Sequence, residues 1–165
     1  MKDGANDPCP CGSNLNYRKC CQDEGNASVP NNPDELLEVR FQALQNEDYE
    51  RLYASYHPQS PFLQQFSDRA TYVRFARHQL SDIKLVNWFK LGRRRLAADR
   101  VEQLLVMEIA VAEGRQFLYE LALLVRTGAG WRYHSAQKLS GEDYRGAPDQ
   151  LDFHHFDDAV QKIRY

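Results

Sequence analysis

Between Val101 and Leu139 the chain reads VEQLLVMEIAVAEGRQFLYELALLVRTGAGWRYHSAQKL. Three runs rich in β-branched, aromatic and aliphatic residues are separated here by two short breaks that contain glycine. Breaks of this length are typical of β-hairpins. A fourth run of similar composition precedes the other three, so we predict a four-stranded antiparallel meander. The predicted strands are Ile83–Leu91, Val101–Ala112, Gln116–Thr127 and Trp131–Leu139, with Glu113-Gly114 and Gly128-Ala129-Gly130 as the loops between the last three.

The two loops also predict the strand register. They place Glu120 opposite Lys138 on one side and opposite Met107 on the other. The simplest role for Glu120 is then a cross-strand ion pair with little effect on stability. Glu108 falls on the opposite face together with Tyr133, and it is the carboxylate to consider for a pocket if that face is the concave one.

Helical periodicity precedes the strands. Asn32-Pro33-Asp34-Glu35 combines a capping side chain, a proline and two acids, which predicts a helix that starts here and runs to about Gln45. Tyrosines at helical spacing predict a second helix from Asp48 that ends at His57-Pro58. A third is expected from Asp68 to about His78, with Ser67 or Asp68 as its cap; its predicted inward-facing residues are Tyr72, Phe75 and Ala76. Helices followed by a meander indicate an α+β domain.

The overall composition limits the classes of partner. The chain has 165 residues, 42% of them hydrophobic, and a net charge of −2. A nearly neutral chain has no general electrostatic attraction to nucleic acid or to an anionic membrane, so we do not expect nucleic-acid binding. Arg93-Arg94-Arg95 is expected to be a solvated turn, with phosphate contact as the alternative.

No apolar run approaches the roughly 18 residues of a membrane span, and the polar start lacks a signal peptide. The expected location is the cytoplasm.

All four cysteines, Cys9, Cys11, Cys20 and Cys21, fall within thirteen residues. Disulfides are the alternative to a metal site, but adjacent cysteines bridge only with strain and a reducing cytosol opposes either bond. Zinc takes four tetrahedral ligands, and two closely spaced cysteine pairs can converge on one ion. We therefore predict one structural Zn²⁺ bound by the four cysteines, because four thiolates leave no open position for catalysis. An iron–sulfur site or a redox pair remains the other reading.

Cys9-Pro10-Cys11-Gly12-Ser13, followed by Tyr17 and Cys20-Cys21, closely resembles the SEC-C motif, the zinc knuckle at the C-terminus of the SecA translocation ATPase. The last ligand of that motif is often histidine, whereas this chain has cysteine. The resemblance implies a docking surface for a protein or a ribosome-associated partner.

The segment Ala43–Tyr53, followed by His57-Pro58, is similar to the opening helices of the nuclear transport factor 2-like superfamily. This resemblance implies a cone, in which two or three N-terminal helices pack on a curved four-stranded antiparallel sheet. Such cones can enclose a pocket, although the fold alone does not define a function. An N-terminal SEC-C knuckle before this domain also resembles the YchJ-like proteins of bacteria.

These patterns divide the chain into four regions. Residues 1–24 form the predicted zinc knuckle, residues 25–32 a linker, residues 33–140 the α+β domain, and residues 141–165 a polar C-terminal tail with one or two helical turns between Phe156 and Ile163.

Two functions fit these patterns. The first is a non-enzymatic, zinc-dependent interaction module that docks to a protein or ribosome-associated partner. The second is a small-molecule-binding or catalytic cone, with a pocket on the Glu108–Tyr133–Gln137 face and the knuckle as a structural cap. No nucleophile elbow, phosphate-binding loop or HExxH motif is present. We assign no catalytic or cofactor-binding residue and favour the first function.

Overall fold

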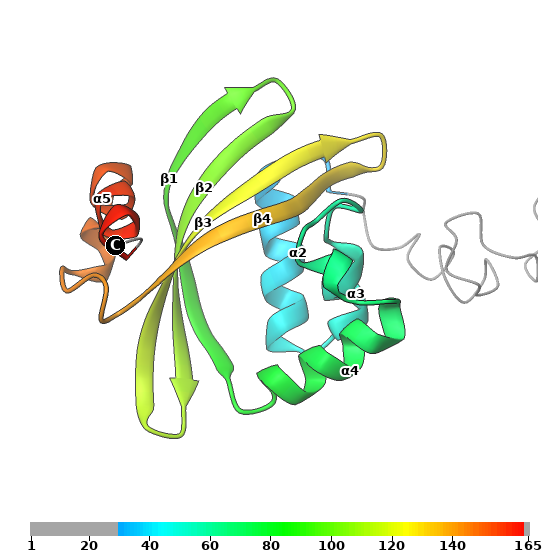
Figure 1. The fold of residues 1–165 in the computed structure, drawn as a ribbon, viewed down its shortest axis with the longest axis horizontal. Coiled ribbons are helices and arrows are strands. Elements are labelled where there is room, and N and C mark those ends of the chain that lie inside the picture. The colour runs from blue at the N-terminus through cyan, green and yellow to red at the C-terminus, as the bar shows by residue number, and fades with distance from the viewer. Residues whose placement is uncertain (1–29, 164–165) are drawn as a thin grey trace, which may run out of the picture.

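The computed structural model describes residues 30–163 and has an α+β fold (Figure 1). Its antiparallel sheet has the strand order β1-β2-β3-β4, as the sequence predicts. No helix in this described part is long and apolar enough to cross a membrane. The strands are β1 (Lys84–Ala97), β2 (Arg100–Val111), β3 (Gly114–Thr127) and β4 (Gly130–Ser140); the helices are α2 (Pro33–Gln45), α3 (Tyr49–Ala54), α4 (Arg69–Leu80) and α5 (Phe153–Ile163), with short 3-10 turns at Leu63–Gln65 and Pro148–Gln150.

The three predicted helix starts are confirmed by their caps. Asn32 Oδ1 accepts a hydrogen bond from the Glu35 amide at 2.9 Å. Asp48 and Asp68 cap α3 and α4 in the same way, at 3.1 and 2.7 Å. Each cap satisfies a backbone amide that has no partner inside the helix.

The sheet is strongly curved, and helices cover both of its faces (Figure 1). Helices α2, α3 and α4 lie against the concave face and α5 lies on the convex face. On the concave side Leu36, Leu37 and Phe41 of α2 pack against sheet residues that include Leu105 and Leu124. The concave face therefore carries the larger helical layer.

The C-terminal segment differs from the predicted polar tail. Helix α5 begins at Phe153 and is three turns long. Phe156 is 0% exposed, and it packs with Leu151 against Leu104 and Leu139 on the convex face. The sequence did not suggest this burial because the few apolar residues of the segment stand among charged and histidine side chains.

Strand β1 is longer than predicted and includes the three arginines that we expected in a turn. Gly92 lies within the strand, and a Cβ there would be 3.0 Å from the Phe153 ring of α5. Arg93 pairs with Asp34 at 2.8 Å, and Arg94 pairs with Glu102. Glycine is a poor strand former, so here the pairing partners of the arginines and the packing of α5 against Gly92 override local propensity.

The register is partly as predicted. Glu120 lies opposite Lys138, but its β2 neighbour is Leu105, not Met107. The reason is that the β2–β3 turn consists of residues 112–113, and Gly114, with φ of 126°, already belongs to β3. A register shift at Leu123/Leu124 also places Tyr133 on the Glu120 face. A β-bulge of this kind reverses the alternation of side chains along β4.

Candidate functional site

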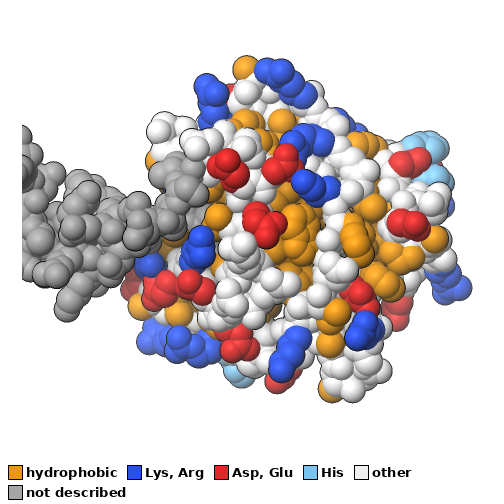
Figure 2. Space-filling view, turned by 180° about the vertical axis from the view of Figure 1, so that it is seen from behind, with side chains coloured by type: hydrophobic (Ala, Val, Ile, Leu, Met, Phe, Trp, Pro, Cys, Tyr) orange, Lys and Arg blue, Asp and Glu red, His pale blue; other side chains and the backbone are white. Residues whose placement is uncertain are grey.

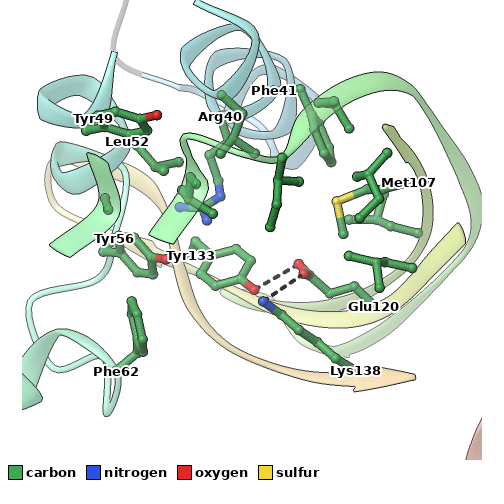
Figure 3. Close-up of a pocket in the computed structure, with 18 of the residues that line it drawn as sticks. Arg40, Phe41, Tyr49, Leu52, Tyr56, Phe62, Met107, Glu120, Tyr133 and Lys138 are labelled. Carbon is green, nitrogen blue, oxygen red and sulfur yellow. Dashed lines mark hydrogen bonds and ion pairs between the residues drawn. The ribbon is translucent and has the colours of Figure 1, made fainter. Parts of the chain in front are cut away.

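A cavity of about 220 Å³ lies between the concave face of the sheet and helices α2–α4 (Figure 3). Its walls are mostly apolar or aromatic, and a few polar side chains converge on it. The apolar lining includes Leu37, Phe41, Leu44, Leu105, Met107 and Ile109, and the aromatic end includes Tyr56, Phe62 and Tyr72. Small-molecule sites in proteins commonly combine an apolar wall with a few polar groups.

Glu120 of β3 supplies the carboxylate of the cavity. Its side chain is only 8% exposed. The Tyr133 hydroxyl donates a hydrogen bond to Glu120 Oε1 at 2.8 Å. The predicted cross-strand ion pair is present, because Lys138 Nζ stands 3.8 Å from Glu120 Oε2, and the Lys138 side chain is 65% exposed. Figure 3 shows the ends of the Tyr133 and Lys138 side chains both pointing toward the Glu120 carboxylate.

Arg40 of α2 is a second buried charge in the same cavity, with 8% of the residue exposed. Its Nη1 donates to Ser55 Oγ at 2.6 Å. The guanidinium carbon lies 3.7 Å from the centre of the Tyr133 ring and 4.5 Å from that of Tyr56. Burial alone would lower the pKa of Arg40, but the Tyr56 and Tyr133 hydroxyls, with Glu120, raise it. Arg40 is therefore a fixed positive charge.

Two tyrosine hydroxyls of the cavity, those of Tyr133 and Tyr72, remain protonated. Burial raises the pKa of Tyr133 well above its usual value, and the negative charge of Glu120 adds to the effect. Burial also raises the pKa of Tyr72, with a further contribution from neighbouring Tyr56. Tyr133 consequently acts as a hydrogen-bond donor to Glu120.

The mouth of the cavity is apolar on one side. Phe75 of α4 lines the cavity, but it is 41% exposed, so the prediction that it faces inward is only partly right. Ile83 also lines the cavity and is 37% exposed. Phe75 and Ile83 therefore lie where the cavity meets solvent, and an entering ligand would contact them.

We predicted a pocket lined by Glu108, Tyr133 and Gln137, and this prediction is wrong for Glu108. Glu108 does not line the cavity, and it pairs with Arg115 at 2.9 Å. Of the three predicted residues, only Tyr133 lines the cavity. Sequence reasoning also missed Arg40. One signal was available, because Arg40 follows Leu36 and Leu37 at the four- and three-residue spacing of an inward helix face.

Among the described residues, no group of three or more His, Cys, Asp or Glu side chains is placed so that it could hold a metal ion. His57 and His134 lie 5.3 Å apart between ring centres. Burial lowers the pKa of His57, and neighbouring His134 and Arg132 lower it further. The four cysteines of the predicted zinc knuckle lie outside the described residues.

Basic side chains do not form a continuous surface on the face shown in Figure 2, where they are scattered among acidic ones. Hydrophobic side chains gather near the middle of this face. Two of the three arginines that could have contacted phosphate, Arg93 and Arg94, are in ion pairs with Asp34 and Glu102. These observations give no support to a phosphate-binding patch on β1.

Known proteins resemble this chain in a short sequence motif and, over part of their length, in sequence. Residues 6–23 match the SEC-C motif, which confirms the predicted resemblance. A UPF0225 protein of Xanthomonas oryzae is 36% identical over 53 residues, which are 32% of this chain and 41% of that protein. A UPF0225 protein of Serratia proteamaculans is 39% identical over 51 residues, 30% of this chain and 33% of that protein. The chain thus spans well under half the length of these curated relatives.

Solved structures with a similar fold confirm the predicted fold class. A SEC-C motif containing protein from Rhodopseudomonas palustris has a TM-score of 0.53 at 15% identity, covering 76% of this chain and 94% of that one. A ketosteroid isomerase-like protein from Erwinia carotovora atroseptica has a TM-score of 0.51 at 11% identity, covering 65% and 92%. A domain with a cystatin-like fold from Nostoc punctiforme has a TM-score of 0.50 at 11% identity, covering 86% and 95%. These similarities show the fold, a nuclear transport factor 2-like α+β cone, in a chain whose residues 6–23 match the SEC-C motif.

Proposed function

We propose that the α+β domain binds a small molecule in the cavity and that Glu120 is the polar group that anchors it. The observation that carries this proposal is a buried carboxylate facing a mostly apolar cavity. Burying a charge costs free energy unless the charge is paired and hydrogen-bonded. Glu120 receives one hydrogen bond, from Tyr133, and its nearest cation stands 3.8 Å away. A ligand would supply a further hydrogen bond to this carboxylate.

The dimensions of the cavity support a ligand of modest size. An apolar protein cavity of about 150 Å³ holds benzene. At about 220 Å³, this cavity accommodates about nine non-hydrogen atoms by the same ratio. This is smaller than the usual drug-sized site of about 300–1,000 Å³, so we expect a compact ligand.

A fragment-binding screen tests this proposal. We expect ligand-observed NMR to find compact fragments that bind the full chain. We expect Glu120→Gln to lower the affinity of the fragments that carry a polar group by about tenfold, because a hydrogen bond to a charged group contributes about 1.5–3 kcal/mol. Glu108→Gln is the matched control, since Glu108 stands outside the cavity, and it should leave binding unchanged. An absence of binding by every fragment would contradict the proposal, as would equal losses in the two variants.

The second candidate function is zinc-dependent docking by the N-terminal knuckle to a protein or ribosome-associated partner in the cytoplasm. The match of residues 6–23 to the SEC-C motif favours it. We propose that Cys9, Cys11, Cys20 and Cys21 bind one structural Zn²⁺. The metal would order the contact residues before binding and so reduce the entropy lost on association. Docking by the knuckle and ligand binding by the cone are compatible in one molecule.

Metal analysis tests the zinc site. We expect one zinc per wild-type chain, and loss of bound zinc in Cys20→Ser after dialysis against a mild chelator, because three thiolates hold the ion less tightly than four. Ser28→Ala in the linker is the control, and circular dichroism checks that the α+β domain stays folded in both variants. A pull-down with the same proteins then tests docking. A zinc-free wild type with four reactive thiols would refute the metal site, and a partner retained equally by Cys20→Ser would refute docking by the knuckle.

A further inference from the structure

We infer that the cavity selects an uncharged, ring-sized molecule that donates a hydrogen bond to Glu120, such as a phenol. This inference rests on the proposed function, because it names the class of ligand that the same cavity would take. Three observations carry it: the free acceptor on Glu120, the balance of charges around the cavity, and the shape of its walls.

The free acceptor is Oε2 of Glu120. The Tyr133 hydroxyl hydrogen is directed to Oε1. Lys138 Nζ is 3.8 Å from Oε2, which exceeds hydrogen-bonding distance. No other side chain in the described part of the protein donates to this carboxylate. A carboxylate can accept about four hydrogen bonds, so Oε2, although ion-paired with Lys138, can still accept hydrogen bonds. It is complementary to a ligand that donates.

The charges around the cavity favour a neutral donor over an ammonium or a carboxylate. Arg40 and Lys138 are positive, and Glu120 is negative. An ammonium group bound at Glu120 would stand near Lys138, and the fixed charge of Arg40 would also oppose it. A carboxylate would meet the negative charge of Glu120 at the position where the donor is needed. A hydroxyl group avoids both repulsions.

The walls of the cavity offer contacts to an aromatic ring. Rings of Tyr56, Phe62 and Tyr72 stand near one another at 5.8–6.3 Å between centres, and Tyr72 meets the other two at 72° and 87°. Aromatic rings pack favourably in such edge-to-face arrangements. The opposite end is lined by aliphatic side chains and by Met107, whose flexible thioether also contacts aromatic rings well. The volume limits the ligand to about one ring with a small substituent.

Four probes of nearly equal size test the inference on the full chain: 4-methylphenol, 4-methylanisole, 4-methylbenzoate and 4-methylbenzylamine. We expect NMR titration to show 4-methylphenol binding about tenfold or more tighter than 4-methylanisole, which has the same ring but no donor. We expect the anion and the cation to bind more weakly than the phenol. Equal affinity for the phenol and the anisole would overturn the inference while leaving the proposed function in place. Tightest binding of the benzoate or the benzylamine would also overturn the inference. Absence of binding by all four probes would overturn the inference, whereas only a fragment screen without any binder would overturn the proposed function.

Two variants assign the discrimination to Glu120. Glu120→Leu removes the acceptor, so we expect the phenol to lose its advantage while the anisole still binds. Tyr133→Phe removes the hydroxyl that occupies Oε1 and keeps the ring under Arg40. We therefore expect this variant to preserve or increase the preference for the phenol, and it tests the inference independently if Glu120→Leu does not fold. An unchanged preference in Glu120→Leu, or its loss in Tyr133→Phe, would contradict a hydrogen bond from the ligand to Glu120.

Discussion

We expect Phe156→Ala to lower the free energy of unfolding by about 3–5 kcal/mol, as is usual when a buried phenylalanine is truncated in a well-packed core. Phe156 is 0% exposed and packs between α5 and the convex face of the sheet, together with Leu104 and Leu139. Alanine favours helix formation, so the loss would come from packing and not from helix propensity. Urea unfolding followed by circular dichroism measures it.

His154→Ala in the same helix is the matched control. The His154 side chain is 80% exposed, and its contacts with Asp158, at 3.6 Å, and with the His155 ring lie on the surface. Substitutions at such positions usually change stability by less than about 0.5 kcal/mol. A change of less than 1 kcal/mol in Phe156→Ala would mean that α5 is a dispensable tail, as the sequence suggested, and not part of the folded domain.

The helices and the strand order were predictable because their signals are local. Asn32, Asp48 and Asp68 each precede an apolar helical pattern, and each caps a helix as expected. The short glycine-containing breaks likewise predicted the hairpins. Phe156 could not be placed in the same way, because its burial depends on a sheet face formed by residues far away in the chain.

The cavity was less predictable than the fold because the strand register decides which side chains face it. Tyr133 was misplaced because we predicted a loop of residues 128–130, whereas Thr127 pairs directly with Gly130 and the pairing near the turn is shifted by one residue. A β-bulge between Tyr133 and Ser135 takes up the extra residue, so the predicted pairing of Glu120 with Lys138 farther along β4 is correct. Strict alternation therefore favoured Glu108 over Glu120, whereas the structure brings Glu120 and Tyr133 into hydrogen-bonding contact.

Arg40 joins the helical layer to the sheet across the cavity. It extends from α2, donates to Ser55 just after α3, and stacks on Tyr133 of β4. One cation thus contacts three elements that the chain supplies at widely separated positions. The same side chain defines the positive side of the proposed ligand site, so its contribution to stability and its contribution to binding have to be measured separately.

We expect Arg40→Met to destabilise the protein by about 2–3 kcal/mol. The variant loses a charged hydrogen bond to Ser55, which contributes about 1.5–3 kcal/mol, and cation–π contacts that contribute up to about 2 kcal/mol when desolvated. Methionine does not have to be stripped of a charge's hydration when it is buried, and this offsets part of the loss. Urea unfolding measures the difference, with Arg77→Met on the exposed face of α4 as the control. We expect the control to change stability by less than about 0.5 kcal/mol.

Arg40→Lys separates the role of charge from that of shape. Lysine keeps the positive charge but lacks the planar group that stacks on Tyr56 and Tyr133, and its ammonium is more strongly hydrated. We therefore expect Arg40→Lys to be at least as destabilising as Arg40→Met. Wild-type stability in Arg40→Lys would show that charge alone is required at this position. Wild-type or greater stability in Arg40→Met would show that the buried arginine is kept at a cost, which would assign it to ligand binding instead of folding.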